Sequence, residues 1–119
     1  GTPGKAFFLA EEGDDFGGYA SVEVQGRKDD GTQIYHLQKI YVMPRFQGTG
    51  LGKMLFEHVM DYLVTVGGKP FRVELNVNRH NKAVGFYEKM GMFRDREGDF
   101  PIGHGYYMND YIYAIEVER

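Results

Sequence analysis

Three glycines fall within the short run Gln47-Gly48-Thr49-Gly50-Leu51-Gly52, directly before a segment with helical periodicity. Glycine has no Cβ, so a ligand can come close to the backbone at such positions. The first turn of a helix also carries unpaired N–H groups and a partial positive charge. Together these properties favour a phosphate group as the ligand, and Lys53 could add a positive charge.

Two common phosphate-binding motifs do not fit this run. A P-loop requires glycine where Gln47 stands and serine or threonine where Met54 stands. A dinucleotide-binding fingerprint that starts at Gly48 and Gly50 requires glycine or alanine where Lys53 stands. For the run taken alone, a tightly packed turn without a ligand remains the alternative.

The flanking sequence predicts the elements that would position the run. Alternation of apolar and polar residues is typical of strands, and apolar residues at i, i+3, i+4 and i+7 are typical of helices. A further strand is expected to begin near residue 92, followed by an irregular segment over 95–105. The other expected strands are 5–10, 19–25, 34–43, 71–77 and 106–117, and the expected helices are 51–66 and 83–90.

This order predicts an α/β fold with a mixed sheet of about six strands and two helices. The first three strands are expected to be antiparallel, and the strand-helix-strand segment that follows favours parallel pairing through a right-handed crossover. Strict alternation within 34–43 would place His36, Ile40 and Val42 on one face of the sheet. The last strand is apolar on both faces, which predicts an interior position.

Composition narrows the class of protein. With 119 residues, 42% of them hydrophobic, the chain is long enough for one folded domain. A formal net charge of −3 disfavours nucleic acid as a partner. The absence of cysteine excludes disulfides and a cysteine nucleophile, and no spacing of His, Asp and Glu indicates a metal site. The absence of cysteine also fits a cytoplasmic protein, which is the location that we expect. No apolar run is long enough for a membrane span.

The glycine run resembles the acetyl-CoA signature Gln-x-x-Gly-x-Gly of the GNAT superfamily of N-acetyltransferases, with Gln47, Gly50 and Gly52 in the matching positions. Residues 78–92 resemble the second GNAT motif, and residues 102–111 are similar to the tails of small bacterial GNAT proteins, including ones that resemble polyamine acetyltransferases. The resemblance implies a GNAT-like fold. It also implies direct acetyl transfer from acetyl-CoA to a primary amine, which could be a polyamine, a small amine or a protein amine.

The resemblance implies roles for single residues. Backbone N–H groups of the glycine run would bind the pyrophosphate of coenzyme A, and the pantetheine arm would pair with the strand before Pro44. Tyr87 would act as the general acid near the cofactor sulfur, although a tyrosine at helical spacing could also be a core aromatic. A backbone N–H near Val42 would polarise the carbonyl. The implied cofactor-binding residues are Ile40, Val42, Gln47, Gly48, Thr49, Gly50, Leu51, Gly52, Lys53, Asn81 and Tyr87.

The general base is less determined. His36 lies where histone-acetylating relatives carry a catalytic glutamate, and an ordinary histidine titrates near pH 6.5. A strand histidine that is hydrogen-bonded within the sheet is an equal alternative. Glu74 and Asn76 on the next strand are other polar candidates, and members of the family often use a chain of waters instead.

The chain departs from the family at its start. A GNAT domain usually has a strand and two helices before the first hairpin, whereas only Gly1 to Gly4 precede it here. We therefore expect an N-terminally truncated domain over 1–119, with strands over 5–43 and the acetyl-CoA-binding half over 44–119. Exposed apolar sheet surface should then favour a homodimer or association with the missing segment. A non-catalytic CoA-binding or dimerisation module is the alternative function, and a plain interaction domain is a third.

Overall fold

The structure, a computed structural model, describes residues 5–103 and 106–118 of the chain. Six strands form one mixed sheet in the order β1-β2-β3-β4-β6-β5. The strands are β1 (Lys5–Glu12), β2 (Asp15–Arg27), β3 (Gln33–Val42), β4 (Phe71–Asn78), β5 (Phe93–Gly103) and β6 (Tyr106–Val117), and the helices are η1 (Pro44–Phe46), α1 (Leu51–Gly67) and α2 (Val84–Lys89).

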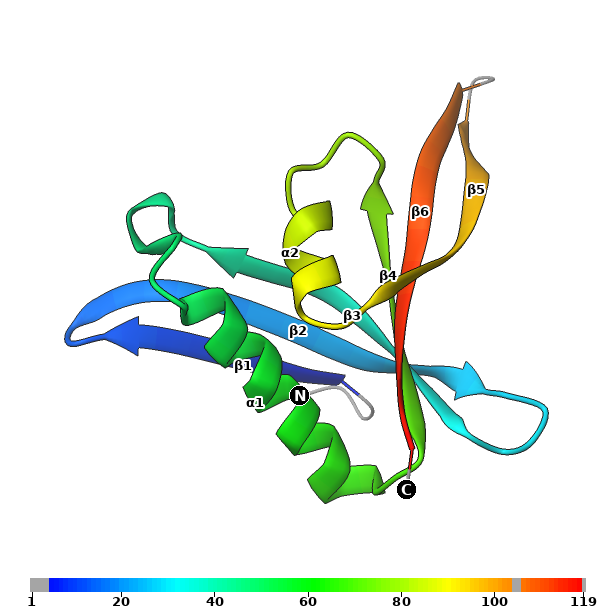
Figure 1. The fold of residues 1–119 in the computed structure, drawn as a ribbon, viewed down its shortest axis with the longest axis horizontal. Coiled ribbons are helices and arrows are strands. Elements are labelled where there is room, and N and C mark those ends of the chain that lie inside the picture. The colour runs from blue at the N-terminus through cyan, green and yellow to red at the C-terminus, as the bar shows by residue number, and fades with distance from the viewer. Residues whose placement is uncertain (1–4, 104–105, 119) are drawn as a thin grey trace.

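Both α-helices lie on the same face of the sheet (Figure 1). The β3–α1–β4 and β4–α2–β5 connections cross the sheet in the same direction, so two right-handed crossovers put both helices on one side. We call this side the helix face and the other side the open face. The core fills the space between the helix face and the helices, and its largest fully buried side chains are Val22, Val59, Leu63, Phe71, Val73 and Tyr113.

A bulge at Gln38 breaks the alternation of β3. Two consecutive residues of β2 pair with residues 37 and 39, so Gln38 is an extra residue in the ladder. One extra residue reverses the side-chain phase of everything after it. His36 therefore lies on the open face, whereas Ile40 and Val42 lie on the helix face. The prediction that these three residues share one face is wrong for this reason.

Strands β3 and β4 pair only over their first halves. Their parallel ladder stops at His36 and Glu74, a pair of residues that we call the vertex. Beyond it, β3 stays paired with β2 up to Val42, while β4 stays paired with β6 up to Asn78. The arrowheads of the two strands point away from each other (Figure 1). Within the described chain, the facing edges of 37–42 and 75–78 therefore have no ladder partner.

The C-terminal hairpin is longer than the sequence predicted. Strand β5 continues through Gly103 and pairs with β6, so the expected irregular segment is wrong over 95–103. Residues 104 and 105 lie outside the described part of the chain. Polar residues and an extra residue at Asp95 in the ladder hide the period-2 pattern of β5. Strand β6 lies between β4 and β5, which confirms the predicted interior position.

The open face carries apolar side chains at its β1 edge. Phe7 and Leu9 are 67% and 73% exposed. Both pair in register with residues of β2 on the face opposite the helices. Some exposed apolar sheet surface was expected from the sequence, and it is found here.

Candidate functional site

The loop between β3 and α1 carries backbone N–H groups without an acceptor. The first helical hydrogen bond of α1 runs from the N–H of Met54 to the carbonyl of Gly50 at 3.0 Å, and no side chain caps the helix. N–H groups at a helix start point along the axis, so they form a positively polarised cradle for an anion. In the described part of the chain, the residues of this cradle whose N–H groups lack an acceptor are Gly48, Gly50, Leu51, Gly52 and Lys53.

The glycines of the cradle serve different purposes. Gly48 and Gly50 have φ angles of 82° and 91°, a region that other residues rarely adopt, and a Cβ at either would have no neighbour within 4 Å. They turn the chain and leave the space in front of the N–H groups open. A Cβ at Gly52 would instead lie 3.0 Å from the ring of Phe86 and 3.5 Å from Val42. Gly52 therefore lets α1 start close to both α2 and β3.

Side chains hold the cradle against the end of β3. The side-chain amide of Gln47 donates a hydrogen bond to the carbonyl of Val42 at 3.1 Å, and the hydroxyl of Thr49 donates to the carbonyl of Phe46. The side chain of Lys53 is 66% exposed, and among the described residues its one salt bridge is a long one to Glu57 within the helix. Its ammonium group is therefore able to reach a phosphate bound at the cradle.

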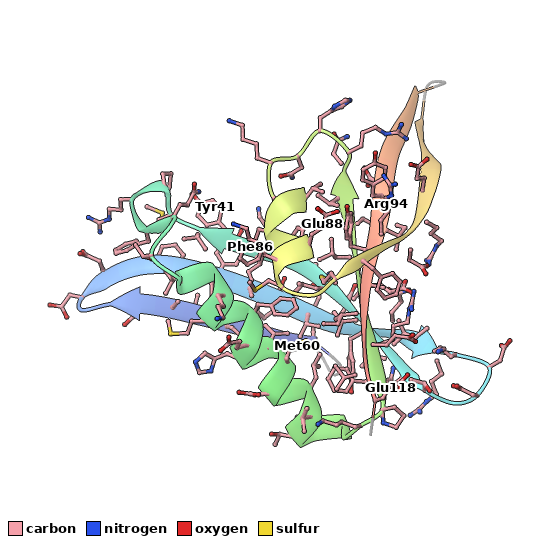
Figure 2. All side chains as sticks on the ribbon, viewed as in Figure 1. Tyr41, Met60, Phe86, Glu88, Arg94 and Glu118 are labelled. Carbon is pink, nitrogen blue, oxygen red and sulfur yellow. The ribbon has the colours of Figure 1, made fainter. Side chains whose placement is uncertain are left out.

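Helix α2 lies beside the cradle and contributes a buried tyrosine. Phe86 lies on the side of α2 that faces β3, and Glu88 lies on the side that faces β6, where its carboxylate accepts a hydrogen bond from the hydroxyl of Tyr113 at 2.9 Å (Figure 2). Tyr87, between them in sequence, is 8% exposed and joins the core. Burial raises the pKa of the Tyr87 hydroxyl, which keeps it protonated near neutral pH.

Two asparagines hold the turn that leads into α2. The side-chain oxygen of Asn78 accepts a hydrogen bond from the N–H of His80 at 3.0 Å, and that of Asn81 accepts one from the N–H of Ala83 at 2.8 Å. These bonds lie within the turn, and the residue that precedes α2, Ala83, makes no side-chain cap, so the expected capping of the helix itself by these asparagines is not found. The amide nitrogen of Asn81 takes no part in that bond, so it can donate to a ligand.

His36 lies at the vertex on the open face, across the sheet from the cradle and α2. Its side chain is about one-third exposed, and its Nδ1 lies 3.8 Å from Oε1 of Glu23 on β2. The two predicted catalytic side chains, His36 and Tyr87, therefore lie on opposite sides of the sheet. Strands β3 and β4 begin to diverge beside His36.

Glu74, an alternative base, is held by three donors on the open face. Its carboxylate accepts hydrogen bonds from Nε of Arg72 at 2.7 Å, from Gln25 at 3.1 Å and from Arg96 at 3.2 Å. Burial alone would raise the pKa of Glu74, but these hydrogen bonds outweigh it and lower the pKa below its usual value. A carboxylate held in its ionised form is a poor proton acceptor. Asn76, the other alternative, has no titratable group.

Other features of the described chain do not compete with this site. Two shallow hollows lie at the starts of β3 and β4, at the opposite end of these strands, and both are lined by Asp30, Thr32 and Pro70. Over residues 5–103 and 106–118, no group of three or more His, Cys, Asp or Glu side chains is placed to hold a metal ion. In the same part of the chain, no helix is long and apolar enough to cross a membrane.

Comparison with known proteins decides the family. A sequence model of the acetyltransferase (GNAT) domain matches residues 2–100. The chain belongs to the GNAT family. The family and the mixed-sheet fold predicted from the sequence are thereby confirmed, whereas the roles of the individual site residues stay predictions.

The peptidyl-lysine N-acetyltransferase YjaB of Salmonella typhimurium is 42% identical to the chain over 57 residues. The match spans 47% of this chain and 34% of that protein, so the chain covers about a third of this relative.

Solved GNAT structures share the fold. A protein assigned to the GNAT family from Desulfovibrio desulfuricans is 27% identical, with a TM-score of 0.73, and the match covers 95% of this chain and 69% of that one. Arabidopsis thaliana Naa50, solved with the bisubstrate analogue CoA-Ac-MVNAL, is 20% identical with a TM-score of 0.73. That match covers 92% of this chain and 71% of Naa50, and it shows the fold alone.

The structure brings most of the predicted GNAT cofactor residues together. Residues 47–53, Ile40 and Val42 meet at the unpaired end of β3, and α2 packs on the same side of the sheet. Sequence reasoning did not find Glu23 or the donors around Glu74. Glu23, Gln25 and Arg96 come from β2 and β5, so their positions depend on strand register and left no local pattern to detect. Arg72 was the one local signal, because it stands two residues before Glu74 on β4.

Proposed function

We propose that this chain is an acetyl-CoA-dependent N-acetyltransferase that transfers the acetyl group directly to a primary amine in a ternary complex. Residues 5–43 and 44–119 would work as one domain. The observation that carries the proposal is a juxtaposition: the cradle of unpaired N–H groups lies against the end of β3, where β3 has lost its ladder partner β4.

The donor would bind along this juxtaposition. The N–H groups of the cradle and the ammonium of Lys53 suit the pyrophosphate of coenzyme A. The open edge of β3 at Ile40 and Val42 offers backbone groups that an extended amide-bearing arm can pair with, as an added strand does. Asn81 would donate its side-chain amide to the same ligand. A bound analogue containing CoA in Naa50, which has the same fold, supports this assignment.

The proposed reaction needs two proton transfers, one at His36 on the open face and one at Tyr87 on the helix face. Acetyl-CoA supplies a thioester, whose carbon–sulfur bond breaks as the bond from the amine nitrogen to the carbonyl carbon forms. A backbone N–H near Val42 would stabilise the oxyanion. His36 would take the proton that the amine nitrogen loses, and Tyr87 would give the proton that the thiolate gains. One proton passed through water returns both residues to their starting forms.

The acceptor would approach from the open face. His36 lies there, opposite the cradle, so donor and acceptor would meet where β3 and β4 begin to diverge. The acceptor class is a primary amine on a polyamine, a small molecule or a protein. Acetylation of peptidyl lysine by YjaB and the peptide portion of the analogue in Naa50 favour testing protein amines first.

A binding and turnover assay tests the proposal. Calorimetry should show acetyl-CoA binding to the chain, and coenzyme A release should be detected with at least one member of a panel of lysine peptides, peptide N-termini, polyamines and small amines. No binding would overturn the donor assignment. Binding without turnover over the whole panel would contradict the enzyme and favour a CoA-binding module.

A further inference from the structure

The vertex places His36 between two carboxylates on the open face. In the ladder, His36 pairs with Glu23 of β2 on one side and with Glu74 of β4 on the other. Paired residues on one face of a sheet bring their side chains close together. Either carboxylate could therefore act on the imidazole.

Only Glu23 is available to His36. Arg72, Arg96 and Gln25 already bind both oxygens of Glu74, so its negative charge is neutralised within its own network. Glu23 has no comparable donors among the described residues. Its salt bridges there are both 3.8 Å long, from Oε1 to Nδ1 of His36 and from Oε2 to the ammonium of Lys5.

The contact between Glu23 and His36 is electrostatic. A separation of 3.8 Å is too long for a hydrogen bond but short enough for an ion pair once the imidazole is protonated. Both side chains are only about one-third exposed, so water screens this attraction only in part. Contacts of catalytic groups are often long in ligand-free enzymes and shorten when substrate binds.

We propose that Glu23 is a positioning residue that acts through His36 in the acetyl transfer. Its carboxylate turns Nδ1 of the imidazole toward β2 and leaves Nε2 to face the acceptor nitrogen. It also stabilises the imidazolium that forms when His36 takes the proton of the amine. This inference rests on the proposed function. It gives the role of orienting and stabilising His36 to Glu23, and not to Glu74, whose carboxylate is already bound by three donors.

A double-mutant cycle tests the coupling. Glu23→Gln should lower kcat roughly three- to tenfold, because an attraction at this distance is lost from the charged intermediate, and the affinity for acetyl-CoA should not change. In a His36→Gln background, the same Glu23 substitution should have almost no further effect on the residual kcat. Equal effects in both backgrounds would overturn the proposal, because Glu23 would then act independently of His36.

Two control substitutions test whether a loss of kcat comes from the charge beside His36 or would follow the removal of any charged side chain. Glu97→Gln removes a carboxylate that lies 3.8 Å from Arg94 on the helix face, and it should leave kcat unchanged. Lys5→Gln removes the competing partner of Glu23 and should not lower kcat. A rise in the KM of the acceptor alone in Glu23→Gln would assign Glu23 to acceptor binding and would also overturn the proposal.

An NMR measurement tests the contact without turnover, so the proposal and the proposed function can fail separately. In wild type, the ring nitrogen shifts of His36 should show the tautomer with the proton on Nδ1, toward Glu23. Glu23→Gln should lower the population of this tautomer, and Glu97→Gln should not. Unchanged His36 shifts in Glu23→Gln would overturn the proposal even in an active enzyme.

Discussion

The cradle follows the end of β3 and the vertex includes His36 in the first half of β3, and the two are built from different groups. The cradle is made of backbone N–H groups, and its space is empty of side chains at Gly48 and Gly50. The vertex is made of side chains, and both oxygens of the Glu74 carboxylate there accept hydrogen bonds. From this difference we infer that the two regions would serve different ligands. The backbone of the cradle would bind the donor, which is the same in every reaction, and the side chains of the vertex would be adapted to the acceptor, which varies.

The two regions should therefore respond differently to mutation. At the cradle, most damage comes from adding atoms, because the N–H groups themselves cannot be deleted by changing a side chain. At the vertex, damage comes from removing one partner of a charged pair, because the remaining charge is left without compensation.

The largest effect is expected at the cradle, from Gly50→Glu. The new carboxylate would stand in the space where an anion is expected to bind, so the affinity for acetyl-CoA should fall more than about 100-fold by calorimetry. Circular dichroism should show that the fold survives.

Gly50→Ala is the matched control for that change. A Cβ at Gly50 meets no atom within 4 Å, but its φ of 91° strains any residue other than glycine. Alanine should therefore cost about 1 kcal/mol of stability and far less affinity than glutamate. Equal losses of affinity in the two variants would show that strain, rather than the bound anion, explains the glycine.

The next largest effect is expected from Tyr87→Phe. This substitution tests the proposed general acid, which lies on the same side of the sheet as the cradle. Removing the hydroxyl should lower kcat about 100-fold and leave acetyl-CoA affinity nearly unchanged, because a general acid acts mainly in the transition state. Tyr113→Phe is the control, since Tyr113 is as deeply buried and its hydroxyl binds Glu88. That control should lose about 1 kcal/mol of stability and keep its kcat. An unchanged rate in Tyr87→Phe would remove Tyr87 from the mechanism.

The comparison also explains how much the sequence could predict. The cradle depends on neighbours along the chain: glycines, a helix start and the Gln47 side chain all lie within a few residues. The predicted element order and the end of β3 before Pro44 were therefore correct. Local signals of this kind survive in one sequence because a helix start and a turn have fixed residue preferences.

The vertex is formed by strands that are far apart in the chain. The sequence did not predict which face of the sheet His36 occupies or which side chains bind Glu74. The side of the sheet that His36 occupies is decided by an extra residue at Gln38. The availability of Glu74 is decided by Arg72, Arg96 and Gln25, which reach it from three strands. Arg72 is the local member of this group, two residues before Glu74 on β4. The bulge and the contacts from Gln25 and Arg96 have no local pattern, because register across a sheet is set by packing and by bulges.

The smallest of these effects is a change in stability at the vertex, from Glu74→Gln. The substitution keeps the shape but removes the charge that faces Arg72 and Arg96. It should lower the free energy of unfolding at pH 7 by about 1–3 kcal/mol in urea denaturation. Glu57→Gln removes an exposed partner of Lys53 and should change the same quantity by less than about 0.5 kcal/mol.

The pH dependence of stability sharpens this test of the vertex. The pKa of Glu74 is lowered in the folded state, so its contribution is complete above the usual carboxyl range and is lost as the pH falls through the lowered value. Wild type should therefore lose stability on acidification, and Glu74→Gln should lose less. Some loss should persist in the variant because Asp95 titrates in the same way: burial would raise its pKa, but hydrogen bonds from Arg96 and Arg72 outweigh burial and lower the pKa. If wild type and Glu74→Gln lost equal stability between pH 7 and pH 3, the charge of Glu74 would not stabilise the fold. The vertex would then not depend on side-chain charge, and its contrast with the backbone-built cradle would be wrong.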